Sequence, residues 1–421
     1  MTCESTPEDL LRTLAPQVLG ALLRRYGTEQ FDLCEDAVQE ALLAAHEQWA
    51  TRGHPDDPAA WLITASRRRL IDRIRSDKRR RDRELTYASL AHPLAQQAAL
   101  ATDDSVLLLR LCCHPALSPA AQVALTLRAV AGLTTAQIAH AYLLPEATVA
   151  QRITRAKARI REAGAVFPSP TSAEDRITPV LTVLYLMFNE GHTATTGRAV
   201  HDVELSGEAI RLARIVRAEL PEHGEAAGLL ALMLLTDARR AARTTPSGAL
   251  IPLDEQDRSL WNQAAIDEGV AILECTLPGR HPSPYLLQAS IAALHDEAPN
   301  TSETDWPQIL VLYKLLERET SNPVVTLNRA VAEAMVHGSA AGLVIVEQLS
   351  ASGLPTDLHR LMAVRAHLLE QAGDRQAAIE AYHSAARATA STPEHDYLLG
   401  RARNLVLSGR KPQTDRTPIA T

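Results

Sequence analysis

Residues 118–162 constrain the fold of this 421-residue chain more than any other stretch, because they predict two short helices joined by a tight turn. Thr134 and Gln137 have the spacing of a capping box, so a helix should begin at Thr135. Proline cannot donate a backbone hydrogen bond inside a helix, so Pro145 ends this helix and suits the first position of the next one. The stretch therefore predicts a helix-turn-helix unit.

The second helix of this unit, residues 146–161, combines an apolar stripe with an exposed basic face. An apolar residue recurs at i, i+4, i+7 and i+11, which predicts one buried face. These residues are Val149, Ile153, Ala156 and Ile160. The polar residues left on the outside are Thr148, Gln151, Arg152, Arg155 and Arg159. Polar side chains followed by arginines on an exposed helix suit the major groove of DNA, and an ordinary solvated basic face is the alternative.

The composition predicts an all-α fold. Alanine and leucine, which favour helices, dominate the chain, aromatic residues make up only 4%, and clear strand-like alternation is absent. A hydrophobic content of 46% is enough for a folded core. Because 421 residues are too many for a single core, we expect two to three domains.

Charge is distributed unevenly along the chain. The net charge of −7 alone argues against a nucleic-acid binder. However, residues 1–165 hold 21 Lys and Arg against 19 Asp and Glu, whereas the remainder holds 22 against 31. Residues 67–83 alone carry ten basic and three acidic side chains. The local field therefore favours a nucleic-acid partner for the N-terminal part.

The five cysteines do not indicate a cofactor. Their spacing is irregular, and Cys112-Cys113-His114 has no second ligand pair at a metal-binding spacing, so buried or idle thiols are the simpler interpretation. No apolar run reaches the roughly 18 residues that a membrane span needs, and no signal peptide opens the chain. We expect no cofactor, no metal, no membrane partner and a location in the reducing cytoplasm.

The N-terminal part reads as helices only. We expect helices at 10–26, 33–49 and 59–81, with a loop at 52–58 that contains two prolines. The third helix has an inner face that repeats every four residues. This face consists of Leu62, Ser66, Leu70 and Ile74.

The pattern divides the chain into three domains. The predicted segments are 7–84, a linker at 85–102, 103–165 with the helix-turn-helix, a Pro/Ser-rich linker at 166–176, a helical domain at 177–410 and a tail at 411–421. Within the third domain, 328–349 overlays 363–384 at an offset of 35, which pairs Gly338 with Gly373. This offset is close to the period of tetratricopeptide (TPR) arrays, so we expect a TPR-like helical extension.

Several motifs resemble bacterial sigma-70-type factors of the extracytoplasmic-function (ECF) class. Those similar to region 2 are DAVQEAL at 36–42, PAAWL at 58–62 and RRRLIDR at 67–73. Those similar to region 4 are LSP at 117–119, GLTTAQIA at 132–139 and PEATVAQR at 145–152. The stretch at 108–113 departs from the pattern by being short, which puts the first helix of region 4 in doubt.

The C-terminal part resembles a subgroup of that class in which a TPR-like extension follows region 4. The similar motifs are LMFNEG at 186–191, LDEQDRSLW at 253–261 and HDEAP at 295–299. From the residues alone, Gly191 is expected to cap a helix end, and a ligand site at the polar stretch 189–192 is the alternative. Asp254, Asp257, Arg258 and Trp261 could line a cavity, although a buried salt-bridge network is the commoner use of such residues.

The resemblance implies a protein that performs no catalysis itself but binds core RNA polymerase and promoter DNA. Asp36, Gln39 and Glu40 would dock on the clamp helices of the largest polymerase subunit, and the chain would also meet the polymerase flap. The residues implied at the −10 element are His54, Asp56, Trp61, Arg67, Arg68, Arg73, Arg75, Lys78 and Arg79, with Arg80 beside them. The residues implied at the −35 element are Thr148, Gln151, Arg152, Arg155 and Arg159.

Other functions stay open on the sequence. A helix-turn-helix regulator with a helical sensing domain would explain 118–162 and the extension, but would leave the basic helix at 67–83 and the acidic face at 36–42 without a role. No hydrolase elbow, phosphate loop or His-Glu-x-x-His pair indicates an enzyme. A pure TPR-like scaffold would ignore the basic half. The extension itself could bind a protein or peptide, mask the DNA-binding half or stabilise the active form.

Overall fold

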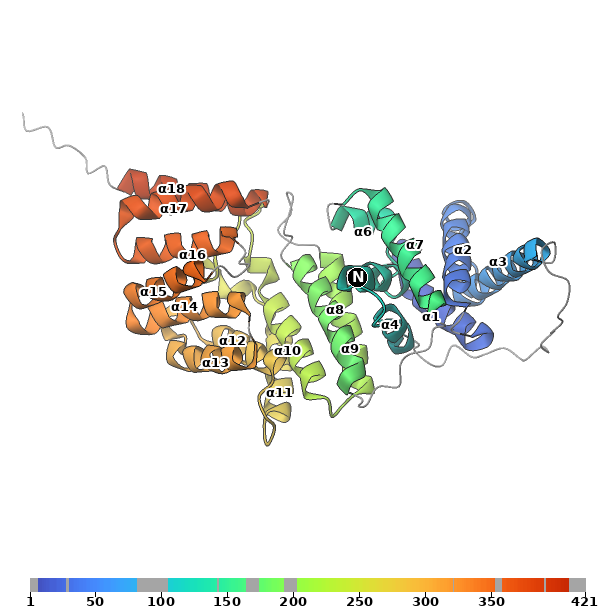
Figure 1. Ribbon diagram of the computed structural model, residues 1–421, viewed down its shortest axis with the longest axis horizontal. Coiled ribbons are helices and arrows are strands. Elements are labelled where there is room, and N and C mark those ends of the chain that lie inside the picture. The colour runs from blue at the N-terminus through green and yellow to red at the C-terminus, as the bar shows by residue number, and fades with distance from the viewer. Residues whose placement is uncertain are drawn as a thin grey trace, which may run out of the picture. The chain divides into compact units, whose positions relative to one another are not determined.

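The computed structural model is all-α, as the sequence predicts (Figure 1). It describes residues 7–27, 30–81, 105–141, 144–163, 174–192, 203–320, 322–352, 358–389 and 391–408. The chain divides into two compact units, Met1–Met187 and Phe188–Thr421. The division falls inside helix α8 (Glu174–His192), whereas the sequence placed the start of the third domain at 177. Each unit is described by itself.

The first three helices, α1 (Pro7–Tyr26), α2 (Phe31–Arg52) and α3 (Pro58–Arg81), pack against one another. Gly27, the expected cap of α1, has a φ of +92°, a conformation that glycine adopts without steric cost. On α3, Leu62, Ser66 and Leu70 are buried as the four-residue repeat predicts, whereas Ile74, the fourth residue of that face, is only half-buried. The residues that α3 buries against its neighbours thus follow from the local sequence pattern of this helix.

The helix-turn-helix group consists of α4 (Ser105–Cys112), α5 (Pro119–Ala129), α6 (Thr135–Ala141) and α7 (Glu146–Glu162). Helix α6 begins at Thr135, as expected. Helix α4 is present despite the short stretch before region 4, and its Leu108, Leu109 and Leu111 are fully buried. Pro145 caps α7 from outside instead of occupying its first position, a shift of one residue at a helix boundary.

Helix α8 corrects one expectation. Gly191 was expected to cap the end of this helix, but it lies within the last helical turn, because α8 continues to His192. A Cβ built on Gly191 would approach the backbone nitrogen of Ser206 to 2.5 Å. Gly191 therefore permits a close approach of α9 (Val203–Glu219) instead of ending a helix.

The C-terminal unit continues as antiparallel helix pairs (Figure 1). Its helices are α10 (Gly224–Ala238), α11 (Gln263–Thr276), α12 (Pro284–Glu297), α13 (Trp306–Glu319), α14 (Pro323–His337), α15 (Ser339–Ala351), α16 (Leu358–Gln371), α17 (Arg375–Ala388) and α18 (Thr392–Ser408). The turns after α14 and α16 contain Gly338 and Gly373, with φ of +91° and +80°. The two glycines paired by the sequence offset thus occupy equivalent turns.

The core of this unit is a series of clusters between neighbouring helix pairs. One cluster joins α10, α11 and α12 around Trp261, a second joins α12, α13 and α14, and two more connect α14 through to α18. Each cluster shares a helix with the next, so each pair covers the apolar face of its neighbour. This is the packing expected of a repeat array.

Strands are absent from the described residues, and only an isolated bridge joins Thr244 to Leu250. Among the described helices, none combines the length and the apolar content that a membrane crossing requires. The predicted linker 85–102 lies outside the described residues, as does most of the linker at 166–176.

A glycine substitution tests the helix packing. In α10, a Cβ on Gly228 would lie 2.6 Å from the backbone nitrogen of Leu286 on α12. We expect Gly228→Ala to lower the free energy of unfolding by roughly 1–3 kcal/mol, because the two backbones must separate. Gly207→Ala in α9 is the control: nothing lies within 4 Å of that Cβ, so we expect stabilisation of up to about 1 kcal/mol. Chemical denaturation measures both, and equal effects would contradict this packing.

Candidate polymerase and DNA interfaces

The acidic face of α2 brings together the three residues predicted to bind polymerase. Asp36, Gln39 and Glu40 lie at i, i+3 and i+4, and each is half-buried. The Arg73 guanidinium of α3 donates a 2.7 Å hydrogen bond to Asp36 Oδ2 and another to Glu40. Arg69 Nε lies 3.8 Å from a second Glu40 oxygen. Arg73, which the resemblance assigns to the −10 track, thus turns towards α2 in this structure.

A buried carboxylate connects α2 to the helix-turn-helix group. The Glu35 side chain is only 1% exposed. It accepts a 3.2 Å hydrogen bond from Arg128 Nε on α5 and a further one from Lys157 Nζ on α7. Lys157 also donates to Asp36 Oδ1 at 2.8 Å. One lysine of the helix predicted to read DNA is therefore bound to the face predicted to bind polymerase.

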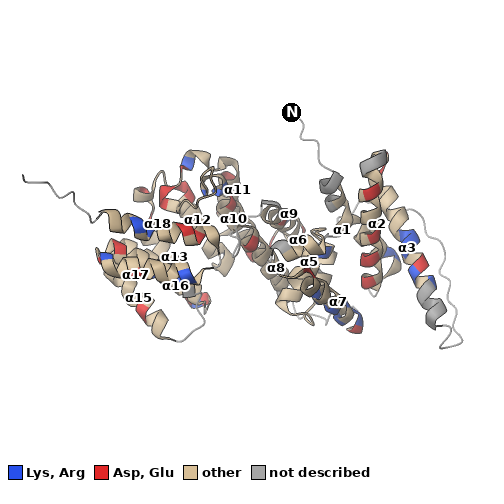
Figure 2. Cartoon of the chain, turned by 90° about the horizontal axis from the view of Figure 1, so that it is seen from above, with Lys and Arg blue, Asp and Glu red and all other residues tan. Residues whose placement is uncertain are grey.

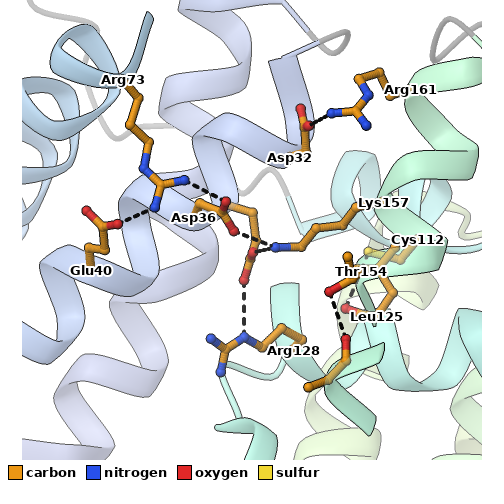
Figure 3. A network of polar contacts seen from close by, with 12 residues as sticks. Asp32, Asp36, Glu40, Arg73, Cys112, Leu125, Arg128, Thr154, Lys157 and Arg161 are labelled. Carbon is orange, nitrogen blue, oxygen red and sulfur yellow. Dashed lines mark hydrogen bonds and ion pairs between the residues drawn. The ribbon is translucent and has the colours of Figure 1, made fainter. Parts of the chain in front are cut away.

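A more exposed ion pair lies at the edge of the same contact. Arg161 Nη1 on α7 donates a 2.7 Å hydrogen bond to Asp32 Oδ2 on α2 (Figure 3). The Arg161 side chain is 61% exposed and that of Asp32 is 15% exposed. Helix α1 also contacts α4 and α5, so the two groups pack directly on each other.

Sequence reasoning did not find these interactions. One signal was available, since Glu35 stands between the buried residues Cys34 and Ala37 on a helix and a buried carboxylate needs a partner. The partners themselves lie 93 and 122 residues further along the chain. No local pattern of the sequence carries that information.

In this network the opposite charges nearby outweigh the effect of burial on the pKa values of Asp36 and Lys157. Burial raises the pKa of Asp36, but Lys157 and Arg73 overcome that effect and hold the pKa below its usual value. Burial likewise lowers the pKa of Lys157, yet Glu35 and Asp36 leave it above its usual value. Lys157 and Asp36 are therefore both charged at neutral pH and attract each other in a partly desolvated site.

The loop between α2 and α3 presents polar residues to solvent. His54 and Asp56 are exposed, and Asp57 caps α3 by accepting a 2.9 Å hydrogen bond from Ala60 N. Trp61 is half-buried and packs edge-on against Trp49, with 5.5 Å between ring centroids. Trp61 thus supports the α2–α3 hairpin directly.

The basic residues of α3 follow one another along the helix next to the acidic residues of α2 (Figure 2). Arg68 and Arg75 are exposed, and Arg67 is half-buried. Lys78, Arg79 and Arg80 lie in α3, but their side chains are outside the described residues. The exposed arginines can form the electrostatic track that a displaced strand requires.

The five residues predicted for the −35 element share one hollow of about 500 Å3. It is lined by Thr148, Gln151, Arg152, Arg155 and Arg159 of α7, together with residues 116–118 and the start of α5. Val149, Ile153, Ala156 and Ile160, the predicted inner face of α7, are all buried. The structure therefore confirms the predicted division of α7 into a core face and a polar face.

The described cysteines carry free thiols, and Cys34, Cys112 and Cys113 are buried. Burial raises the pKa of Cys112 well above its usual value and that of Cys113 to about 12. Such thiols are poor metal ligands and poor nucleophiles. No group of three or more His, Cys, Asp or Glu side chains in the described part of the chain could hold a metal ion.

The C-terminal unit contains a second cavity of about 500 Å3, lined by residues of several of its helices. Asn328, Val331 and Met335 enter it from one face of α14 at i, i+3 and i+7. Its aromatic lining residues are Trp306, Tyr313, Tyr382 and Tyr397. Its other lining residues come mainly from α16 and from the loops around 252–258 and 295–304.

Arg258 joins the two loops that border this cavity. Its Nη1 donates 2.7 Å hydrogen bonds to the carbonyls of His295 and Ala298, and its guanidinium lies 4.4 Å from the ring centroid of the buried Trp261. Of the four residues singled out in this loop, Asp254 and Arg258 line the cavity, Asp257 caps a short helical turn and Trp261 is in the core. Arg258 therefore binds carbonyls and an indole.

The side chains available to a ligand in this cavity are mainly uncharged. Burial, with Arg239 and Arg258 nearby, lowers the pKa of His295 to about 4, and burial also lowers the pKa of His367. Both imidazoles are thus neutral at pH 7. The Nε1 of Trp306 is buried and has no hydrogen-bond partner among the described residues. Arg401 pairs with Glu255 and Glu370.

Comparison with known proteins indicates the class of protein that this chain resembles. Residues 10–80 match the model of sigma-70 region 2 and residues 110–160 that of sigma-70 region 4. These matches cover the α1–α3 group and the helix-turn-helix group. These two regions support a sigma-70-type factor with a role in promoter recognition.

Within this class the chain belongs to one family with an uncharacterised protein of Rhizobium meliloti (strain 1021). The two are 43% identical over 345 residues, which cover 79% of this chain and 81% of the relative. Residues 176–277 match a family of unknown function (DUF6596). No solved structure matches the chain.

Acidification tests the charge of the network. Because Lys157 and Arg73 depress the pKa of Asp36, its contribution is present above the unfolded pKa of about 3.9 and is lost as the pH falls through the lower folded value. The side chain is 41% exposed, so we expect wild type to exceed Asp36→Asn in unfolding free energy by about 1 kcal/mol or less between pH 5 and 7.

This difference should begin to shrink as the pH falls below about 3.9 and should approach zero once the pH is below the lowered folded pKa of Asp36. Urea unfolding at each pH measures it, and Glu47→Gln, at an exposed position of the same helix, controls for the loss of one negative charge. A difference that persists unchanged at the lowest pH would contradict the ion pairing of Asp36.

Proposed function

We propose that this chain is an ECF-type sigma factor that binds core RNA polymerase, recognises −10 and −35 promoter elements and promotes strand opening in the cytoplasm. The observation that best supports the proposal is the DNA-facing hollow of α7, which gathers all five residues expected at the −35 element. The acidic face of α2 would bind the clamp helices of the largest subunit, and region 4 would meet the flap.

Strand opening would take place at the α2–α3 hairpin. A base that leaves the DNA stack costs a few kcal/mol, so the displaced strand must be held elsewhere. The exposed loop with His54 and Asp56 and the arginines Arg68 and Arg75 supply polar and cationic contacts for that strand. With few aromatic residues nearby, capture would rest mainly on charge and would weaken steeply with salt.

Run-off transcription with purified core polymerase tests this function. A sigma factor redirects the core enzyme to specific start sites, whereas a helix-turn-helix regulator, the alternative, cannot do so without another sigma factor. Specific transcripts from genomic fragments would support the proposal. Binding to DNA without any association with the core enzyme would favour the regulator.

The extension would modulate this activity by binding an uncharged, extended peptide segment in the cavity of the C-terminal unit. The cavity is lined by residues from several helices, α13, α14, α16, α17 and α18 among them, which suits an extended chain. The exposed amide of Asn328 offers both a donor and an acceptor, as a peptide bond does, and Met335, 39% exposed, adapts to varied side chains. Arg258 already donates a hydrogen bond to the His295 carbonyl, and Arg401 is paired with Glu370. These two arginines therefore do not favour an anionic ligand.

Replacement of Arg152 tests base recognition. If Arg152 pairs with a guanine, Arg152→Ala should weaken binding to the −35 element by roughly 1–3 kcal/mol and leave binding to unrelated DNA nearly unchanged. The control variant is Arg403→Ala, which removes one positive charge at an exposed position of α18. Titration of labelled duplexes at fixed salt measures both. An equal loss on all duplexes would identify a phosphate contact instead.

Selection from a random nine-residue peptide library by the full chain tests the cavity. We expect enrichment of uncharged peptides with aromatic or aliphatic side chains, and a loss of at least tenfold in affinity for Trp306→Ala, since buried aromatic contacts dominate such interfaces. Val311→Ala is the control, because Val311 is 57% exposed on the same helix and does not line the cavity. Enrichment of charged peptides, or equal binding by Trp306→Ala, would refute this ligand.

A further inference from the structure

We propose that one end of the cavity in the C-terminal unit binds a primary ammonium group, and that the amino terminus of the bound peptide supplies it. We call this end the acidic corner, and it is lined by Asp254, His367, Gln371, Tyr382 and Tyr397. The inference rests on the proposed peptide ligand and specifies which end of that peptide the cavity holds. Because the side chains of the proposed ligand are uncharged, its terminal ammonium is the cation that this corner can bind.

The loop that carries Asp254 places this residue beside the last helices of the unit. Glu255, the next residue, accepts a 3.2 Å hydrogen bond from Arg401 Nη1 of α18. Further along the same loop, Arg258 donates hydrogen bonds to two carbonyls at the end of α12. The loop therefore extends between α18 and α12, and Asp254 lies on the side of α18, together with the other residues of the acidic corner.

The negative charge of Asp254 is not compensated. Asp254 is exposed where it lines the cavity, and the described residues give its carboxylate neither a hydrogen bond nor an ion pair. Arg401 already pairs with Glu255 and Glu370. Burial, together with Arg401, lowers the pKa of His367 although Glu370 and Asp254 oppose this shift, so the imidazole adds no positive charge at pH 7. The corner thus combines three carboxylates with one guanidinium, and a cationic ligand restores the balance.

Two tyrosines give the acidic corner the other groups that an ammonium requires. The Tyr382 hydroxyl donates a 2.5 Å hydrogen bond to Glu370, so its oxygen can still accept one. Burial raises the pKa of Tyr382 and of Tyr397, so both phenols are neutral at pH 7. Aromatic rings attract cations through their quadrupole, and phenol oxygens accept hydrogen bonds from them. A carboxylate flanked by two such rings therefore favours an ammonium over an uncharged group.

The size and the charges of the cavity select the amino end of a peptide. Sites of about 300–1,000 Å3 enclose drug-sized ligands, so a cavity of about 500 Å3 holds only a few residues. The end of a chain suits it better than a long internal segment. A carboxyl end would require an available cation, but Arg258, the guanidinium among the described lining residues, already donates to two carbonyls. The amino end is thus the one that the lining favours.

Acetylation of a peptide tests the ammonium subsite. The probe is the peptide most enriched from the nine-residue library, synthesised with a free or an acetylated amino terminus and labelled at its carboxyl end. Fluorescence anisotropy measures its affinity for the full chain. We expect acetylation to weaken binding to wild type about three- to tenfold, because it removes the charge that Asp254 and the two tyrosines would bind.

Two variants complete this experiment. Asp254→Asn should weaken binding of the free peptide by about the same factor and leave binding of the acetylated peptide unchanged, which also shows that the variant is folded. Glu347→Gln is the control, because it removes one negative charge at an exposed position of α15 outside the cavity. It should affect neither peptide.

A lysine distinguishes the two possible sources of the ammonium. The acetylated peptide is synthesised again with lysine as its first residue. We expect it to bind more weakly than the free peptide, because the flexible lysine stem loses conformational freedom when its ammonium is held in place. If it instead regains the full affinity, and loses it again with Asp254→Asn, the ammonium belongs to a side chain and the assignment to the amino terminus is overturned.

The outcomes separate the ammonium subsite from the proposed peptide ligand. If the free and acetylated peptides bind equally well, or if Asp254→Asn weakens both by the same factor, the subsite is wrong, and the peptide ligand stands as long as Trp306→Ala weakens binding. If the library yields no enriched peptide, or if Trp306→Ala binds as wild type does, the peptide ligand fails and the subsite fails with it.

Discussion

The N-terminal unit depends on the neutralisation of one buried carboxylate. Glu35 is almost fully removed from water on α2, and a carboxylate in that position costs several kcal/mol unless cations and hydrogen bonds surround it. Arg128 and Lys157 supply that compensation from the helix-turn-helix group. Because Lys157 is long enough to bridge to Asp36 as well, the same requirement places α7, the helix proposed to read DNA, against the acidic face of α2. The packing of the two regions thus follows from the charge balance of a single site.

The arginines of this chain act in different ways according to their partners. Arg73 binds two carboxylates across the α2–α3 hairpin, and Arg258 binds carbonyls and an indole in the extension. Arg155 and Arg159, in contrast, remain exposed beside the hollow of α7. Composition alone cannot separate these uses. The acidity of the C-terminal part likewise says little about its cavity, whose lining residues are mostly uncharged.

Local patterns of the sequence were sufficient for the helices but not for the contacts between them. The repeat of Leu62, Ser66 and Leu70 and the stripe of Val149, Ile153 and Ile160 depend on neighbours within one helix, and the structure confirms both. The shift at Pro145 and the role of Gly191 depend on how a helix meets its surroundings, and there the sequence interpretation was wrong. The pairing of Glu35 with Lys157 joins residues 122 positions apart, so it required the fold. The five residues of the α7 hollow were found because the helical period alone brings them to one face.

The equivalent turns at Gly338 and Gly373 have an evolutionary consequence. Each turn closes a helix pair that buries its apolar surface on the preceding pair, so the duplication or loss of one such module would preserve every interface except those at the ends. The extension can therefore gain or lose length during descent without disturbing the two promoter-facing regions. Such changes would alter the length of the C-terminal unit and leave the residues of regions 2 and 4 unchanged.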